Sequence, residues 1–408
     1  MTLNRREFVG LIGAAAVAAA ADQPHSQILI DSEDAARMRD FAKRGRAALA
    51  DNLVQVDKLA TEALGAGPWS VTYQRPAGLN VNAGTNDYVS EGPYWWPDPK
   101  NPAGPYIRKD GERNPGRFMG NRSDLEKMTE SVLALGMGAF FLSKAGCAEH
   151  ANRVLSVWFV DSRTRMNPDL EHGQMVRGVN TGRGTGIIDT VSLIHAAQGV
   201  TLLETAGGLD AGVAQGVRRW YADYLKWLTT SRNGLDEKSS GNNHATWWTA
   251  QAASFAAFTG DAAAQRMCWD HYRNYLVPTE IKPDGSCPLE EERTQSLSYS
   301  SMNLDAFATI CRLAQMAGVD LWHFRTAKGL SVGASVDKSF HYLMPYVAQP
   351  DKWKKPQITK YSADSYVFPG LAGIGLPDQA LLAEYLKLPR SESGWIQFVD
   401  ILVRCAKG

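Results

Sequence analysis

Residues 239–248, SSGNNHATWW, open a helical run that extends to Phe258 near the middle of the 408-residue chain. Two amides and an imidazole stand here beside a pair of tryptophans. An amide donates hydrogen bonds to a carboxylate without carrying charge, and an imidazole exchanges a proton near neutral pH. Tryptophan adds an apolar platform with a polar edge. The stretch therefore indicates either a capped helix, with Asn242 or Asn243 as the N-cap, or half of a site for an acidic sugar.

Helical patterns continue on both sides of this stretch and dominate the chain. They cover residues 34–64, 123–144, 148–161, 187–204, 211–229, 243–258, 262–276, 301–316, 335–344 and 379–386. Ser123 with Glu126 is typical of a capping box, Gly146 is placed to end that helix, and the few strand signals include Val71–Tyr73. Helices joined by short and long loops in alternation indicate antiparallel pairs. Small residues lie where helices would pack closely. We predict an all-α fold, an α/α toroid (an incomplete α/α barrel) with loops forming a cleft at one end.

The composition restricts the partners of the protein. The chain has 43 basic and 43 acidic side chains, so no global field favours nucleic acid or an anionic membrane. Hydrophobic residues make up 44% of the chain, enough for a large core. The five cysteines form no CxxC pair, which argues against a structural zinc site and predicts that most are buried as small apolar residues. A single disulfide is an alternative.

The N-terminus has the pattern of an export signal. The twin arginines of residues 4–10 precede an alanine-rich apolar run over residues 11–21. That run is too short to span a bilayer and lacks a polar face, so it predicts a twin-arginine signal peptide, 1–21, cleaved near Ala21. The remaining residues, 22–408, then form one toroid domain. We expect a periplasmic or secreted protein that is not inserted in the membrane after cleavage.

Residues 68–122 contain eight prolines and cannot form one helix. A loop of this length usually has a functional reason. Its aromatic and arginine side chains are typical of a ligand-binding wall; the candidates for substrate contact are Tyr94, Trp95, Trp96 and Arg108. The alternative is a structural wrap over the end of the barrel.

A second loop, residues 166–186, carries further polar candidates. Gln174, Asn180 and Arg183 are secondary candidates for substrate contact. His172 is the other histidine most expected to line a cleft, whereas His195 falls inside a helical pattern and is expected to pack between helices.

Residues 290–300, EEERTQSLSYS, form the second dense polar stretch, just ahead of a helix. Arg293 offers a bidentate fork to a carboxylate, and Tyr299, six residues later, can act as an acid and, once ionised, as a base. The alternative is an arginine paired with a neighbouring glutamate and a tyrosine that caps the helix.

Together the two stretches supply what β-elimination on a uronic acid needs. The C5 proton lies next to a carboxylate and is very weakly acidic while that carboxylate is charged. Hydrogen bonds from Asn and Arg must neutralise the charge, a base must take the C5 proton, and an acid must protonate the glycosidic oxygen at C4. One tyrosine can do both if the two groups lie on one face of the ring; otherwise His and Tyr divide the work. No metal or other cofactor is required.

These motifs resemble the alginate lyase superfamily. The NNH triplet at 242–244 followed by tryptophan, and the pattern Glu-x-x-Arg-Thr-x-Ser-Leu-x-Tyr at 290–299, are similar to polysaccharide lyase families five and thirty-eight. GPYWWPDP (92–99), PYIRKDG (105–111), RMNP (165–168) and GRGTGIID (182–189) are closer to the second family. The resemblance spans about half of the chain, and it implies an α/α toroid and a lyase that cleaves a 1,4-linked uronate polymer.

The resemblance also implies roles for single residues. Asn243, with Asn242 nearby, would contact the substrate carboxylate, and His244 would be the base or a second carboxylate contact. Arg293 would neutralise charge, Tyr299 would be the acid or both acid and base, and Trp247 would contact substrate. In family five the Arg and Tyr are seven residues apart with a His before the Tyr, whereas here the spacing is six and a serine precedes the Tyr. The uronate therefore stays open among mannuronan, guluronan, glucuronan and related glycans.

Two other classes of protein fit the same fold. A glycoside hydrolase would need two carboxylates across the cleft, for which the candidates are Asp98, Asp189 and Glu291 or Glu292. A non-catalytic glycan-binding protein would need only the aromatic and polar wall.

Overall fold

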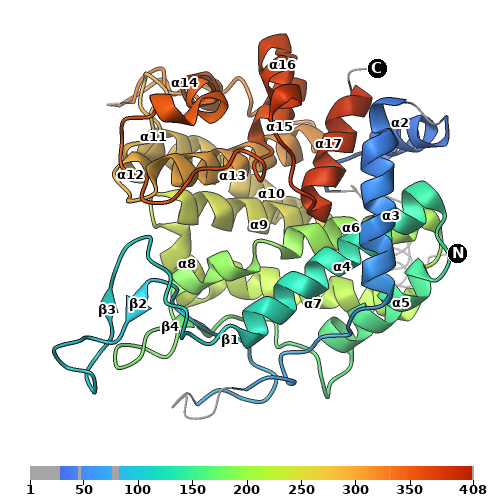
Figure 1. Ribbon diagram of the computed structural model, residues 1–408, viewed down its shortest axis with the longest axis horizontal. Coiled ribbons are helices and arrows are strands. Elements are labelled where there is room, and N and C mark those ends of the chain that lie inside the picture. Colours follow the sequence, from blue (N-terminus) through green and yellow to red (C-terminus); the bar gives the residue numbers. More distant parts are fainter. Residues whose placement is uncertain (1–27, 45–46, 76–81, 330, 407–408) are drawn as a thin grey trace, which may run out of the picture.

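The computed structural model describes residues 28–44, 47–75, 82–329 and 331–406; the predicted signal peptide lies outside them. Within these residues the chain forms a helical toroid (Figure 1). Its inner helices pack in chain order, and the last one returns to the first. They are α4 (Gly120–Leu142), α6 (Leu193–Ala206), α9 (Asn243–Thr259), α13 (Ser296–Met316), α15 (Phe368–Gly375) and α17 (Gly394–Ala406).

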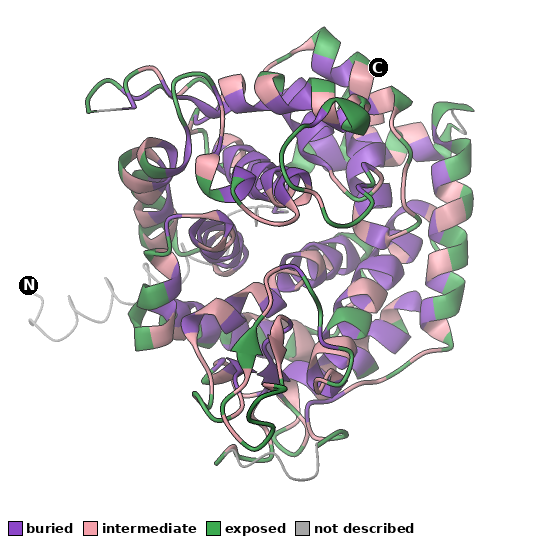
Figure 2. Ribbon diagram, turned by 60° about the vertical axis from the view of Figure 1, so that its left-hand side comes forward, coloured by how far each residue is buried: buried purple, intermediate pink, exposed green. Residues whose placement is uncertain are grey.

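The outer helices are amphipathic, and each packs on an inner helix with its apolar face. They are α3 (Ala50–Leu64), α5 (Cys147–Leu155), α7 (Ala211–Thr230), α10 (Ala262–His271), α14 (Val336–Ala348) and α16 (Gln379–Lys387). Figure 2 shows exposed faces on helices at the outside, whereas helices near the centre are buried almost all round. This two-layer arrangement confirms the predicted toroid.

Glycines allow the inner helices α4 and α6 to approach closely, as predicted for the small residues. A Cβ atom on Gly136 would lie 2.6 Å from the carbonyl oxygen of Gly199, and one on Gly199 would lie 2.6 Å from that of Val132. The stretch Gly184–Ala206 is long and apolar enough to cross a membrane, but most of it is buried inside the protein. Its packing on α4 and α9 is that of a core helix.

Short elements connect the pairs of helices and build the rim of the toroid. They comprise α2 (Ser32–Lys43), α8 (Arg232–Lys238), α11 (Val277–Glu280), α12 (Pro288–Glu291), the 3₁₀ turns Ala47–Leu49, Gly184–Thr190 and Pro350–Lys352, and the π-helical turns Ser156–Val160 and Tyr272–Leu276. Strand β1 (Val89–Glu91) pairs in parallel with β4 (His172–Met175), and β2 (Trp95–Trp96) pairs in antiparallel fashion with β3 (Ile107–Arg108). All four strands lie at one end of the toroid (Figure 1).

Several predicted boundaries are wrong. The pattern at 34–64 is two helices: α2 ends at Lys43, with Arg44 as its C-cap, and α3 begins at Ala50. Helix α4 begins at Gly120, so Ser123 lies inside its first turn and its backbone N–H bonds to the carbonyl of Met119. Gly146 precedes α5 instead of ending α4, which ends at a left-handed Ser143.

Other predictions for the chain have mixed outcomes. Residues 71–73 form a turn and not a strand. Helix α13 begins five residues before the predicted start. The short helices α8, α11, α12 and α15 and the longer helix α17 were not predicted. The cysteines are all buried and free, which confirms their role as small apolar residues.

Candidate active site

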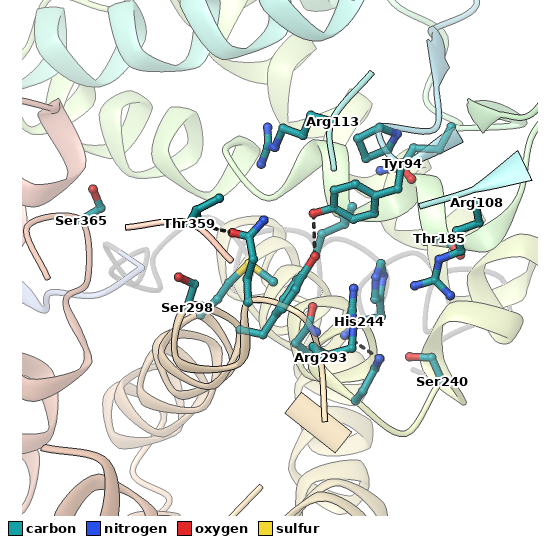
Figure 3. Close-up of a pocket in the computed structure, with 18 of the residues that line it drawn as sticks. Tyr94, Arg108, Arg113, Thr185, Ser240, His244, Arg293, Ser298, Thr359 and Ser365 are labelled. Atoms are coloured by element: carbon teal, nitrogen blue, oxygen red, sulfur yellow. Dashed lines mark hydrogen bonds between the residues drawn. The ribbon is translucent and has the colours of Figure 1, made fainter. Parts of the chain in front are cut away.

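A cleft of about 600 Å³ opens at the end of the toroid where the strands lie. Four parts of the chain line it: the β2–β3 hairpin and the residues after it, the segment from β4 to residue 188, the N-termini of α9 and α13, and residues 359–366. Of the predicted wall loop 68–122, Tyr94, Trp95 and Arg108 lie on the cleft wall. Figure 3 shows side chains from these parts facing one another.

The N-terminus of α9 contributes three consecutive residues to the cleft. Asn242 is the N-cap, and its side-chain oxygen accepts a hydrogen bond of 3.2 Å from the backbone N–H of His244. Asn243 is fully buried, and its Nδ2 lies 2.8 Å from both carboxylate oxygens of Glu290. Burial raises the pKa of Glu290, although the hydrogen bonds from Asn243 oppose this. The interpretation as a capped helix is confirmed, with Asn242 as the N-cap, and the same stretch lines the polar cleft.

His244 is held by a buried carboxylate. Its Nδ1 lies 2.6 Å from Oε1 of Glu237, a residue of α8 whose side chain is only 3% exposed. Burial lowers the pKa of His244, but the charge and hydrogen bond of Glu237 outweigh this, so the pKa lies above its ordinary value. Because Nδ1 is bonded to Glu237, Nε2 is the ring nitrogen left for a ligand in the cleft.

Arg293 connects the wall loop to the start of α13. Its Nη2 and Nε lie 2.8 and 3.2 Å from the two carboxylate oxygens of Asp110, which follows β3. Burial raises the pKa of Asp110, but the hydrogen bonds and charge of Arg293 outweigh this and lower it to about 2. The same carboxylate accepts a bond of 2.7 Å from Arg108. The guanidinium of Arg293 also lies 3.9 Å from the ring centre of Tyr299, a cation–π distance.

Tyr299 lies in the first turn of α13, and its hydroxyl meets the hydroxyl of Tyr94 at 2.6 Å. The dashed line from Tyr94 in Figure 3 marks this bond. Burial and the neighbouring Tyr94 raise the pKa of Tyr299 well above its ordinary value, while the charge of Arg293 acts in the opposite direction. Tyr299 is therefore protonated at neutral pH and able to donate a proton.

Arg183 lines the cleft and is bonded to neutral groups. Its Nε and Nη2 each lie 3.0 Å from oxygens of Gln174, the carbonyl and the side-chain Oε1. In the described part of the chain no carboxylate forms an ion pair with it. Burial lowers the pKa of Arg183, and the charges of Glu237 and Asp189, which are not bonded to it, offset this only in part.

Gln174 positions this arginine, and it is itself held from behind. It is 3% exposed, has a left-handed φ of 46°, and donates from Nε2 to Asp189 at 2.9 Å. A non-glycine residue in this conformation is uncommon and is often found at functional sites. Asp189 also accepts bonds from Ser90 at 2.6 Å and from Arg122 at 3.1 Å.

Three predicted contact residues do not line the cleft. Trp247 packs against the hydrophobic core. Trp96 donates to the carbonyl of Glu112 at 3.0 Å, on the far side of the hairpin from Trp95. Asn180 accepts a bond of 3.1 Å from the backbone of Val176 and so shapes a turn. His172 also misses the cleft, and its Nδ1 lies 3.0 Å from the carbonyl of Thr181.

The carboxylates proposed for a hydrolase are also absent from the cleft lining. Asp98, Asp189, Glu291 and Glu292 all lie outside it among the described residues. Asp189 is buried behind the wall, and Glu291 is paired with Lys355. His195, as predicted, packs between helices: it stacks on Trp395 at 4.2 Å.

The partner carboxylates were not predicted from the sequence. Asp110 stands in the quoted PYIRKDG motif and Glu290 begins the second polar stretch, but neither could be matched to Arg293 or Asn243 without the fold. Glu237 lies seven residues before His244 but on a separate short helix, α8. No helical period therefore links the two residues, and the sequence did not indicate that they pair. Arg113 also lines the cleft from the wall loop. In the described ranges, no group of three or more His, Cys, Asp or Glu side chains is arranged to hold a metal ion.

An all-helical toroid with a Tyr, a His and several arginines in one terminal cleft defines a class of polysaccharide lyase. The alginate lyase family model matches residues 74–353, and the chain belongs to this family. An alginate lyase from Bacteroides ovatus is 28% identical, with a TM-score of 0.83 over 92% of this chain and 98% of that one. The protein is thus an enzyme, a polysaccharide lyase, as the sequence motifs implied.

More distant structures share the fold. Alginate lyase A1-III from Sphingomonas species A1 is 18% identical, with a TM-score of 0.52 over 80% of this chain and 88% of that one. A His-to-Ala variant of A1-III in complex with a tetrasaccharide gives a TM-score of 0.54 at 18% identity, over 81% of this chain and 88% of that one. A comparison with curated proteins finds no match.

Proposed function

We propose that this lyase cleaves a 1,4-linked uronate polymer of the alginate type by β-elimination and leaves a C4–C5 unsaturated sugar at the new end. The observation that carries this proposal is that a protonated tyrosine, a histidine bonded to a carboxylate, and an arginine bonded to neutral oxygens instead of a carboxylate face one cleft. The similar structures support alginate as the substrate, since they are alginate lyases and one is in complex with a tetrasaccharide.

The substrate carboxylate needs a positive neighbour before C5 can lose its proton. Asn243 was predicted for this role, but its Nδ2 is already bonded to Glu290. Arg293 was predicted as well, and Asp110 occupies its fork. Arg183 has bonds only to uncharged oxygens of Gln174. We therefore assign the main carboxylate contact to Arg183, with Arg293 adding positive charge beside Tyr299.

Tyr299 and His244 divide the proton transfers in this proposal. Tyr299, with its raised pKa, holds its proton and donates it to the glycosidic oxygen at C4. His244 accepts the C5 proton at Nε2, while Glu237 stabilises the resulting imidazolium through Nδ1. Tyr299 would perform both steps on a uronate whose C5 proton and C4 oxygen lie on one face of the ring.

The proposal is tested with a panel of uronate polymers. Purified protein is incubated with polymannuronate, polyguluronate and glucuronan, and ultraviolet absorbance follows the double bond conjugated to the carboxylate. We expect absorbance to grow with at least one polymer. New reducing ends without absorbance would show hydrolysis, and binding without either product would show a glycan-binding protein; each result would sink the lyase mechanism.

Glu237→Gln is expected to shift the pH dependence of turnover. In the native protein, activity falls as the pH drops through the raised pKa of His244, because the base must be neutral. Removing the charge of Glu237 lowers that pKa, since Glu237 is the main group that raises it while burial and Arg293 act against it. The acid limb of the kcat profile should move to lower pH, and the plateau should fall by about tenfold or more because the base is weaker.

Kinetics of the native and Glu237→Gln proteins across pH provide the measurement. Glu171→Gln is a matched control, because Glu171 accepts bonds from Trp227 and Asn233 and does not line the cleft. An unshifted acid limb in Glu237→Gln would mean that His244 is not the base.

We also propose that the enzyme is exported through the twin-arginine pathway. The support is the paired arginines and the apolar run of residues 1–21. Mass spectrometry of the exported protein should find a mature N-terminus close to Asp22, and an intact leader in the exported fraction would disprove cleavage.

A further inference from the structure

A second hollow, of about 280 Å³, lies beside the active-site cleft and shares one lining residue with it. Lys360 lines both. The other residues of the hollow come from the start of α13 and from the segment after α14; they are Leu297, Pro350, Asp351, Trp353, Gln357 and Tyr361. We call this the lysine hollow, because the segment 349–360 that forms its rim is rich in lysine.

The charge of this segment differs from that of the whole chain. Its sequence, QPDKWKKPQITK, has four lysines and one aspartate, an excess of three positive charges in a chain whose net charge is zero. Lys355 is paired with Glu291. Lys352 and Lys360 are exposed, and within the described ranges no carboxylate lies in ion-pair contact with either. Lys360 and Asp351 line the hollow itself, and Lys352 stands next to Asp351 in the same segment, so the excess positive charge lies along the edge of the hollow.

The floor of the hollow is rigid because it is bonded to the helix that carries Tyr299. Trp353 donates from Nε1 to Ser296 at 2.7 Å, and the hydroxyls of Tyr361 and Ser301 lie 2.9 Å apart. The side-chain oxygen of Gln357 accepts from the backbone of Leu297 at 3.1 Å. Trp353 and Tyr361 are buried and present only their edges to the hollow, so a sugar would meet its polar groups and Lys360.

The position of the hollow fits a polymer that leaves the cleft. In Figure 3, Thr359 and Ser365 lie on one side of Tyr94, whereas Arg108, Thr185 and Ser240 lie on the other. A sugar chain that crosses the cleft past Tyr94 would therefore extend from Arg108 and Thr185 toward residues 359–366. Lys360 stands at that exit and continues into the lysine hollow.

We propose that the lysine hollow is an accessory subsite that binds carboxylate-bearing sugars of the same polymer beyond the catalytic cleft. This rests on the proposed function, since the ligand is the uronate chain. A long polymer spans the cleft and the hollow, whereas a tetrasaccharide held at the catalytic groups reaches no further than Lys360, the residue that the two share. The subsite therefore favours long chains over short products.

The test compares chain lengths in the variant Lys352→Gln/Lys360→Gln. The ratio of kcat/KM on long polymer to kcat/KM on tetrasaccharide is expected to fall about three- to tenfold, because each exposed ion pair contributes modestly. The KM for polymer should also become less sensitive to salt, since added ions screen the lysine contacts. The control Lys43→Gln/Lys226→Gln makes the same change of charge on the outer helices α2 and α7, and it should leave the ratio unchanged.

These experiments distinguish failure of the accessory-subsite proposal from failure of the lyase proposal. An active native enzyme with an unchanged ratio in the double variant would overturn the accessory subsite and leave the lyase proposal standing. If native protein forms no unsaturated product from any polymer, the affinity of the long polymer for native and double-variant protein decides the matter by calorimetry. Weaker binding by the variant would support the hollow as a polyuronate site, and equal binding would overturn it.

Discussion

Tyr299→Phe is expected to lower kcat on the best uronate polymer by about a thousandfold, a loss typical of removing a general acid. This variant lacks the hydroxyl that would protonate the leaving oxygen. Its phenyl ring still lies under the guanidinium of Arg293, which is 3.9 Å from the ring centre in the native protein. The KM should change by no more than about threefold, because the substitution leaves the arginines of the cleft intact. Ultraviolet assays of initial rate give both constants.

Tyr94→Phe is the matched control for this prediction. It removes the other half of the 2.6 Å hydroxyl pair and keeps the hydroxyl of Tyr299. Because the bond from Tyr94 helps to raise the pKa of Tyr299, this variant should lower that pKa and retain far more activity than Tyr299→Phe. Equal losses in the two variants would show that the pair acts as a structural unit, and Tyr299 would then lose its assignment as the acid.

Those parts of the fold that follow from apolar residues at helical spacing could be predicted from the sequence. Inner and outer helices such as α7 and α9 were located within one residue, because their apolar patterns are long and end at glycine or polar caps. Short helices were missed for a physical reason. Helix α8 spans seven residues, too few for a period to emerge, and it is held in place by packing on its neighbours.

The active site was predictable in its residue types and less so in its pairings. His244, Arg293 and Tyr299 do meet in one cleft, as the sequence motifs implied. What the sequence could not supply is which polar groups are already satisfied. Asn243 is bonded to Glu290, 47 residues away, and Arg293 to Asp110, 183 residues away. These contacts form only when the ring of helices closes. They decide which polar side chains remain available to the substrate, and local sequence patterns do not contain that information.

Arg183 is one residue whose role depends on these contacts. The sequence made it a secondary candidate for substrate contact, and we now propose it as the main ligand of the substrate carboxylate. Arg183→Ala is expected to lower kcat/KM by about a hundredfold or more, the loss typical of removing a group that stabilises developing negative charge. Arg183→Lys should recover part of the activity, since it keeps the charge and loses the planar fork. Arg108→Ala serves as the control: it removes a cleft arginine that is already paired with Asp110, and the loss should stay within about tenfold.

Stability separates a functional role from a structural one for Arg183. A partly buried cation without a carboxylate partner costs folding free energy, so Arg183→Ala should unfold at the same temperature as the native protein or higher. The two oxygens of Gln174 lose their donor in that variant, but an uncompensated charge is more costly than two unmet acceptors at the wall of an open cleft. Loss of activity without loss of melting temperature would show that the charge is kept for the substrate. A large drop in melting temperature, or kcat/KM within tenfold of native, would return Arg183 to the role of a wall residue and leave Arg293 as the carboxylate contact.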